Sequence, residues 1–224
     1  MFRLVVVPLR IAVMSNAGFV TQTSLRDFLT ALASAEDAHG TVSAAAFAAA
    51  LGTSLLLKSA ALPKTKSDSI DDRTALIKSA TALRVVQEQL IETIETETAV
   101  RVFAARRMPE IRPVQKRERE AALQLALRAA ADVPLEVMRL SAAALTHAED
   151  VAAHCCQAAS RNIQLAVALL REGFDAARVN LESKLSTLTD VLYTASVIDE
   201  VSRLSEEATT KARAVEALVQ LPPA

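Results

Sequence analysis

Apolar residues recur at steps of three and four along most of this chain, which is the spacing of one face of an α-helix. One series lies between residues 71 and 108 and comprises Leu76, Ala80, Leu83, Val86, Leu90 and Ile94. Another lies between residues 190 and 221 and comprises Leu192, Ala195, Ile198, Val201, Leu204, Ala208, Val215 and Leu218. The spacing predicts a long helix over each stretch, with a bend of the first near Thr96 and Thr98.

Local signals place the remaining helices. Ser24 with Asp27 three residues later fits a capping box and predicts a short helix over residues 24–34. An alanine-rich helix is predicted over residues 42–62, where Pro63 ends it. The next helix runs from about 114 to 160, with a kink or restart at Pro134. A further helix is expected to begin at Asn162 and to reach about Leu188.

Glycine is scarce, and this decides the fold class. The chain has four glycines, and none lies between Thr53 and Glu172. Because hairpins and tight turns usually need glycine, the sequence predicts an all-α fold. At 224 residues the chain can bury a large core, and a single helical domain is expected over residues 23–221.

The alanine-rich helix is expected at the centre of the bundle. Its small side chains let several helices approach it closely, so we expect little water contact before Lys58. They are Ala44, Ala45, Ala46, Ala48, Ala49 and Ala50. The apolar run over residues 44–57 is too short for a typical membrane span, so a buried core helix is favoured.

Residues 1–22 differ from the rest of the chain, because they carry Arg3 and Arg10 and no acidic residue. An acid-free, arginine-bearing leader is typical of a mitochondrial transit segment, and matrix localisation is the expectation. The alternatives are an ordered or frayed N-terminal extension and a cytoplasmic protein. Pro8 and Arg10 interrupt the apolar run, which argues against a span or a secretory signal here.

Charge and metal-ligand patterns exclude other classes of function. The net charge is −1, so the excess of basic residues on which nucleic-acid binding rests is absent. Basic residues gathered between Arg101 and Arg119 are diluted by acids and are interpreted as a solvated connection. His154, Cys155 and Cys156 are adjacent, whereas structural zinc needs four well-spaced ligands. We therefore expect no metal site.

Four stretches resemble the cyclodeaminase/cyclohydrolase family, which includes the cyclodeaminase half of formiminotransferase-cyclodeaminase and stand-alone methenyltetrahydrofolate cyclohydrolases. They are residues 24–34, residues 43–51, residues 129–137 with their Val-Pro-Leu sequence, and residues 184–190 with Asn180 before them. The resemblance covers about residues 23–221. It implies an elongated helical bundle, usually dimeric, that binds a folate between helices.

The chain departs from the family where the chemistry is expected. The family's glycine-rich loop reads His39-Gly40-Thr41-Val42-Ser43 here, and the Asp expected near residues 161–163 is replaced by Arg161 and Asn162. An acidic motif survives as Glu95-Thr96-Glu97. Because carboxylates at i and i+2 do not share a helix face, both are expected to be solvated.

From this resemblance, candidate site residues follow. The catalytic candidates are His39 and Glu95. The candidate folate-binding loop is His39, Gly40, Thr41 and Ser43. The candidate pocket on the late helix is Asn162, Asn180 and Lys184.

Two functions remain open. In the first, the chain is a non-catalytic family descendant, a structural or partner-binding subunit of a larger assembly, present as a homodimer or bound to other proteins. In the second, it is a folate one-carbon enzyme, either a formiminotetrahydrofolate cyclodeaminase or a methenyltetrahydrofolate cyclohydrolase. The loss of the loop glycines and of the Asp favours the first. A tetrahydrofolate derivative is the one cofactor that the resemblance implies.

Overall fold

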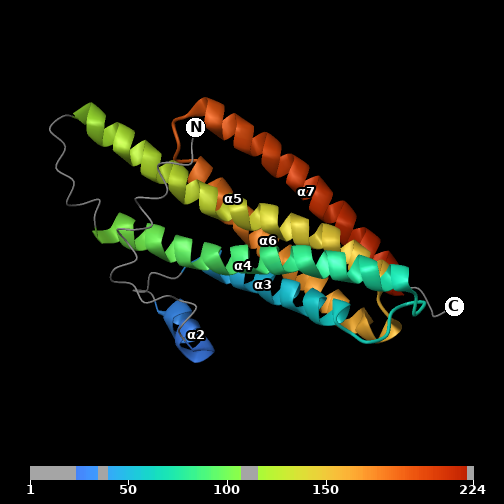
Figure 1. The fold of residues 1–224 in the computed structure, drawn as a ribbon. Coiled ribbons are helices and arrows are strands. Elements are labelled where there is room, and N and C mark those ends of the chain that lie inside the picture. The colour runs from blue at the N-terminus through green and yellow to red at the C-terminus, as the bar shows by residue number, and fades with distance from the viewer. Residues whose placement is uncertain (1–23, 35–39, 107–115, 221–224) are drawn as a thin grey trace.

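The computed structural model describes residues 24–34, 40–106 and 116–220, and these residues form a helical bundle (Figure 1). The helices are α2 (Leu25–Ala33), α3 (Thr41–Ala60), α4 (Ile70–Arg106), α5 (Lys116–His154), α6 (Ser160–Leu185) and α7 (Val191–Gln220), with a 3₁₀ turn at Gln157–Ala159 before α6. Within the described residues, the one β feature is an isolated bridge between Thr65 and Cys155. The predicted all-α class is therefore confirmed.

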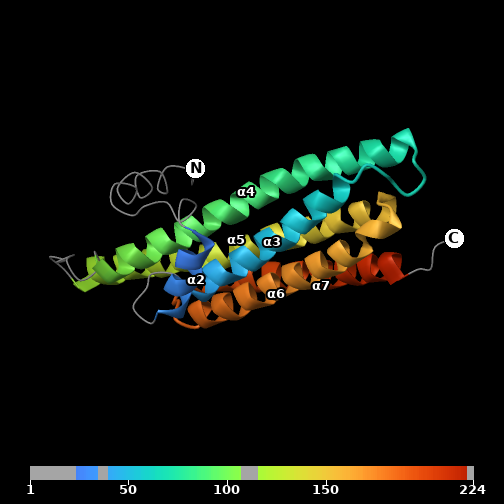
Figure 2. The same cartoon turned by 90° about the horizontal axis from the view of Figure 1, so that it is seen from below.

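The bundle is elongated, because five long helices run side by side along one axis (Figures 1 and 2). Helix α3 packs against α4, α5 and α6, and α7 covers α5 and part of α6. The short helix α2 stands off one end and touches the bundle where the rings of Phe28 and Phe47 lie 5.2 Å apart. The alanine-rich helix is thus central, as predicted.

Close contact between α3 and α6 depends on two glycines. A Cβ atom at Gly52 would lie 2.8 Å from the carbonyl oxygen of Ala166, and one at Gly173 would lie 2.7 Å from that of Ala45. Both distances are too short for real Cβ contacts, so the two helix backbones meet directly at these points. The two helices run antiparallel, since Gly52 faces the first half of α6 and Gly173 faces the first half of α3.

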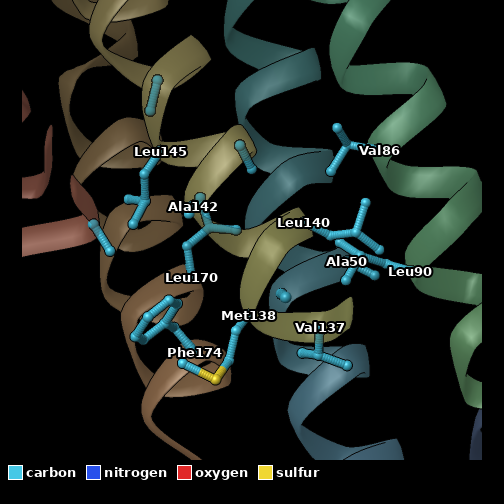
Figure 3. Close-up of a cluster of buried hydrophobic side chains, with 14 of the residues drawn as sticks. Ala50, Val86, Leu90, Val137, Met138, Leu140, Ala142, Leu145, Leu170 and Phe174 are labelled. Carbon is cyan, nitrogen blue, oxygen red and sulfur yellow. The ribbon is translucent and has the colours of Figure 1, made fainter. Parts of the chain in front are cut away.

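Larger apolar side chains fill the space that the small residues leave. Figure 3 shows Leu90, Met138, Leu170 and Phe174 from α4, α5 and α6 gathered beside Ala50 of α3. All of them are buried. Burying side chains of this size is worth about 1.5–3 kcal/mol each before entropy is counted, which makes this layer the main source of stability.

Two expectations about these helices are corrected. Helix α5 continues through Pro134, so there is no restart at that residue. Val133 and Leu135 on either side are buried, and their packing offsets the roughly 3 kcal/mol that an interior proline costs. The outer side of α3 also meets water before Lys58, because Leu51 is 43% exposed.

Helix α3 is, among the described helices, the one long and apolar enough to cross a membrane, judged by length and composition. Half of its most apolar window is buried within the bundle. The core helix of a helical bundle has the same properties, which agrees with the interpretation of α3 as a core helix.

Candidate functional site

The start of α3 carries the residues that correspond to the expected ligand loop. Gly40 is the N-cap residue, with φ −123° and ψ −177°. Any residue can adopt this extended conformation, so the backbone itself does not require glycine there. Val42 is 2% exposed and belongs to the core. His39, the catalytic candidate on this loop, lies outside the described residues.

Thr41 joins the start of α3 to the end of α6. Its hydroxyl donates a 2.7 Å hydrogen bond to Oδ1 of Asn180. The amide nitrogen of Asn180 donates to the carbonyl of Ala176 in its own helix at 2.8 Å. Both side-chain atoms of Asn180 are therefore engaged. This contact brings together two residues of the predicted site that lie 139 positions apart in the sequence.

Ser43 joins the same end of α3 to α4. Its hydroxyl donates a 2.7 Å hydrogen bond to Oε2 of Glu97. Ser43 is fully buried and Glu97 is 5% exposed. The expectation that this acidic motif is solvated is therefore wrong for Glu97, while Glu95 is half-buried. The N-terminus of α3 provides partial positive charge, which favours a carboxylate nearby.

The sequence contained a signal for the burial of Glu97. The apolar series on α4 ends at Leu90 and Ile94, and a further step of three residues reaches Glu97. The same face of the helix is buried at all three positions. An acidic residue in register with an apolar stripe is a stronger candidate for a site than its neighbour two residues away.

The three polar residues predicted on the late helix do not form one pocket. Asn180 and half-buried Lys184 lie near the end of α6, whereas Asn162 lies near its start. Asn162 and Asn180 are eighteen residues apart (180 − 162), which is about 27 Å along a helix. Arg161, where the family's Asp is expected, is exposed at the distant end. Within one chain, that position and Gly40 therefore lie at opposite ends of the bundle.

A second polar cluster, not predicted from the sequence, ties the α3–α4 loop to α5. Nδ1 of His154 lies 2.8 Å from Oδ1 of Asp72, and the backbone N–H and the hydroxyl of Ser67 donate to Oδ2 at 2.8 and 2.7 Å. Asp72 is 8% exposed. Hydrogen bonds from His154 and Ser67 hold the pKa of the Asp72 carboxyl well below its ordinary value.

The neighbouring cysteines have no sign of metal chemistry. The thiol of Cys155 is buried and donates to the carbonyl of Ser59 at 3.1 Å. Burial raises its pKa to about 11, so it is a neutral thiol at physiological pH. Across the described ranges, no group of three His, Cys, Asp or Glu side chains is arranged to hold a metal ion.

Two surface cavities are lined by described residues. One, of about 280 Å³, lies between the α3–α4 loop and the first turns of α4. The other, of about 590 Å³, runs along Leu25, Leu29 and Ala33 of α2. Neither is lined by Gly40, Ser43 or Glu97, so the hydrogen-bonded pairs at the start of α3 stand apart from both.

Comparison with known proteins gives the family. The formiminotransferase-cyclodeaminase family model matches residues 24–203. The chain belongs to this family. A crystal structure of formiminotetrahydrofolate cyclodeaminase from Thermotoga maritima is similar, with a TM-score of 0.79 over 90% of this chain and 98% of that one. The two sequences are 17% identical, so this likeness shows the fold alone. A comparison with curated proteins gave no match.

Proposed function

We propose that this member of the formiminotransferase-cyclodeaminase family is non-catalytic and acts as a structural or partner-binding subunit. The observation that carries the proposal is the buried hydrogen bond between Ser43 and Glu97. A general acid or base must come within about 2.6–3.2 Å of the proton it transfers. Here the carboxylate at the expected ligand loop is enclosed and bonded to a neighbouring helix.

The other polar residues at this end support the same proposal. Thr41 and Asn180 are hydrogen-bonded to each other, and Val42 packs into the core. In a ligand site of the expected kind, these positions would present backbone N–H groups and free amide groups to a folate. In this chain they connect α3 to α6 instead, and the bundle gains stability where a binding site would use it for the ligand.

Partner binding is supported by apolar side chains left on the surface of the long helices. Leu51 on α3, Leu165 on α6 and Leu192 on α7 are all exposed. We propose a homodimer or docking on a larger assembly as the reason for them. Mitochondrial import directed by residues 1–22 remains part of the proposal, with a cytoplasmic protein as the alternative; a fluorescent fusion of those residues that stays cytosolic would contradict import.

The second candidate function is a folate one-carbon enzyme, either a cyclodeaminase or a cyclohydrolase. Family membership favours it, and so does the position of Glu97, a carboxylate from α4 beside the N-terminus of α3. In this reading Glu97 acts as the general acid or base once a ligand displaces Ser43, with His39 as a further catalytic candidate. Glu95, two residues away and half-buried, would support rather than replace it.

Titration calorimetry of the purified full chain with tetrahydrofolate separates the two functions. The non-catalytic proposal predicts no binding heat at folate concentrations up to about 1 mM, which corresponds to a binding free energy weaker than about −4 kcal/mol. Binding in the micromolar range, lost or weakened in a Glu97→Gln variant that still folds, would favour the enzyme instead.

A further inference from the structure

The cavity at the start of α4 has two unpaired charges of opposite sign. Its lining includes Arg73 and Asp68. The guanidinium of Arg73 donates to the carbonyl of Pro63 at 2.6 Å, and Oδ1 of Asp68 accepts from the N–H of Thr65 at 3.1 Å. Among the residues that the structure describes, neither charge forms an ion pair. Two opposite charges thus line the same cavity without neutralising each other.

Thr65 provides an independent sign of a ligand. It lines the same cavity and is 6% exposed, yet its hydroxyl has no hydrogen-bond partner within the described part of the chain. Buried polar groups in native structures are nearly always hydrogen-bonded, and an exception calls for an explanation. A polar ligand group in the cavity would supply the missing partner.

The loop around the cavity is held in a specific shape. Asp68 has φ 52°, a left-handed conformation that Asp tolerates better than most residues. Next to it, both donors of Ser67 are fixed on Asp72, which is itself paired with His154. Strained backbone positions held by their surroundings are typical of ligand-binding sites. The loop therefore fixes the Asp68 carboxylate before any ligand arrives.

We propose that this cavity binds a small zwitterion of the α-amino acid class. The carboxylate of the ligand pairs with Arg73, its ammonium group pairs with Asp68, and one of its polar atoms satisfies the hydroxyl of Thr65. At about 280 Å³ the cavity is just below the range of sites for drug-sized ligands, which fits a small molecule. Pro63 and Ile70 give the lining an apolar part, which suits a short aliphatic side chain.

This site is independent of the proposed function, because the cavity lies at the opposite end of α3 from Gly40. Its test therefore does not depend on folate binding or turnover. Calorimetric titration of the full chain with glycine, L-alanine, L-valine and L-leucine, alongside acetate and ethylamine, tests the charge pattern. At least one amino acid should bind about tenfold more tightly than either single-charge probe. No binding of any amino acid, or equal binding of acetate, would overturn the proposal.

Variants then locate the site. Asp68→Asn removes the charge, but asparagine tolerates the left-handed backbone and keeps the acceptor for the N–H of Thr65. It should weaken amino-acid binding about tenfold. The matched control is Asp71→Asn, an exposed acid in the same helical turn that does not line the cavity, and it should change binding less than twofold. Equal effects of the two variants would contradict the assignment.

Thr65→Val separates binding from stability. The valine removes a buried hydroxyl that has no partner, so the thermal unfolding midpoint without ligand should not fall. Amino-acid binding should nevertheless weaken. A variant with a lower midpoint and unchanged binding would show that the hydroxyl serves the fold and not a ligand.

Discussion

The Ser43 hydroxyl donates a 2.7 Å hydrogen bond to the Glu97 carboxylate, and both side chains are buried between α3 and α4. Fifty-four positions separate the two residues in the sequence. The bond joins the loop end of the alanine-rich helix to the acidic motif of the long helix. It makes the residues expected to serve chemistry into a helix–helix contact, and its worth can be measured.

Ser43→Ala should destabilise the protein by about 1–3 kcal/mol, because it removes a buried donor from a buried carboxylate. Urea unfolding followed by circular dichroism measures the change. Thr41→Val is the control, since it removes a hydrogen bond of equal length at an exposed position and should cost about 0.5 kcal/mol or less. Equal losses in the two variants would contradict a special role for the buried pair.

Gly173→Ala tests the contact between the backbones of α3 and α6. The new methyl group would meet the carbonyl oxygen of Ala45 at 2.7 Å, and a backbone atom cannot move aside as a flexible side chain can. We expect a loss of about 1–3 kcal/mol from overpacking. Ala168→Leu, on the exposed side of the same helix, should change the free energy of unfolding by about 0.5 kcal/mol or less. An unchanged or stabilised Gly173→Ala protein would show that the helices separate easily.

Asp72→Asn tests the cluster at the other end of the bundle. The pKa of Asp72 is lowered in the folded state by His154 and Ser67, so its carboxylate stabilises the fold above its unfolded pKa of about 3.9. That contribution declines as the pH falls below about 4 towards the lower folded pKa. Wild type should therefore be more stable than the variant at pH 5, with a smaller difference at pH 2.5.

Urea unfolding of both proteins at the two pH values measures this difference. The control is Asp71→Asn, an exposed acid one residue away, whose stability difference from wild type should vary little with pH. A difference between wild type and Asp72→Asn that stays constant from pH 5 to pH 2.5 would contradict the assigned role of the carboxylate.

Self-association should involve the outer side of α3, where Leu51 is exposed although the rest of the helix is largely buried. Light scattering at micromolar concentration should give the mass of a dimer, and Leu51→Glu should shift it to a monomer. Ile77→Glu, at an exposed position of α4, is the control and should remain dimeric. A stable wild-type monomer would contradict the homodimer.

Periodicity was enough to predict the helices, because each long helix has one apolar face with regular spacing. It failed at Pro134, where burial of the flanking Val133 and Leu135 outweighs a local helix-breaking signal. The paired contacts could not be predicted: Asp72 and His154 are 82 positions apart, and nothing local links them. The separation of Asn162 from Asn180 followed already from placing both on one helix.

The central claim is tested most directly by following the loss of methenyl absorbance when the purified full chain is mixed with methenyltetrahydrofolate. The same assay, run on the conversion of 5-formiminotetrahydrofolate, covers the cyclodeaminase activity. Wild type, Glu97→Gln and His39→Ala are compared. A positioned acid or base supplies about 10²–10⁴-fold in rate, so a non-catalytic chain should give the uncatalysed rate with all three proteins. Robust wild-type turnover that falls at least a hundredfold in either variant would contradict the claim and make that residue catalytic.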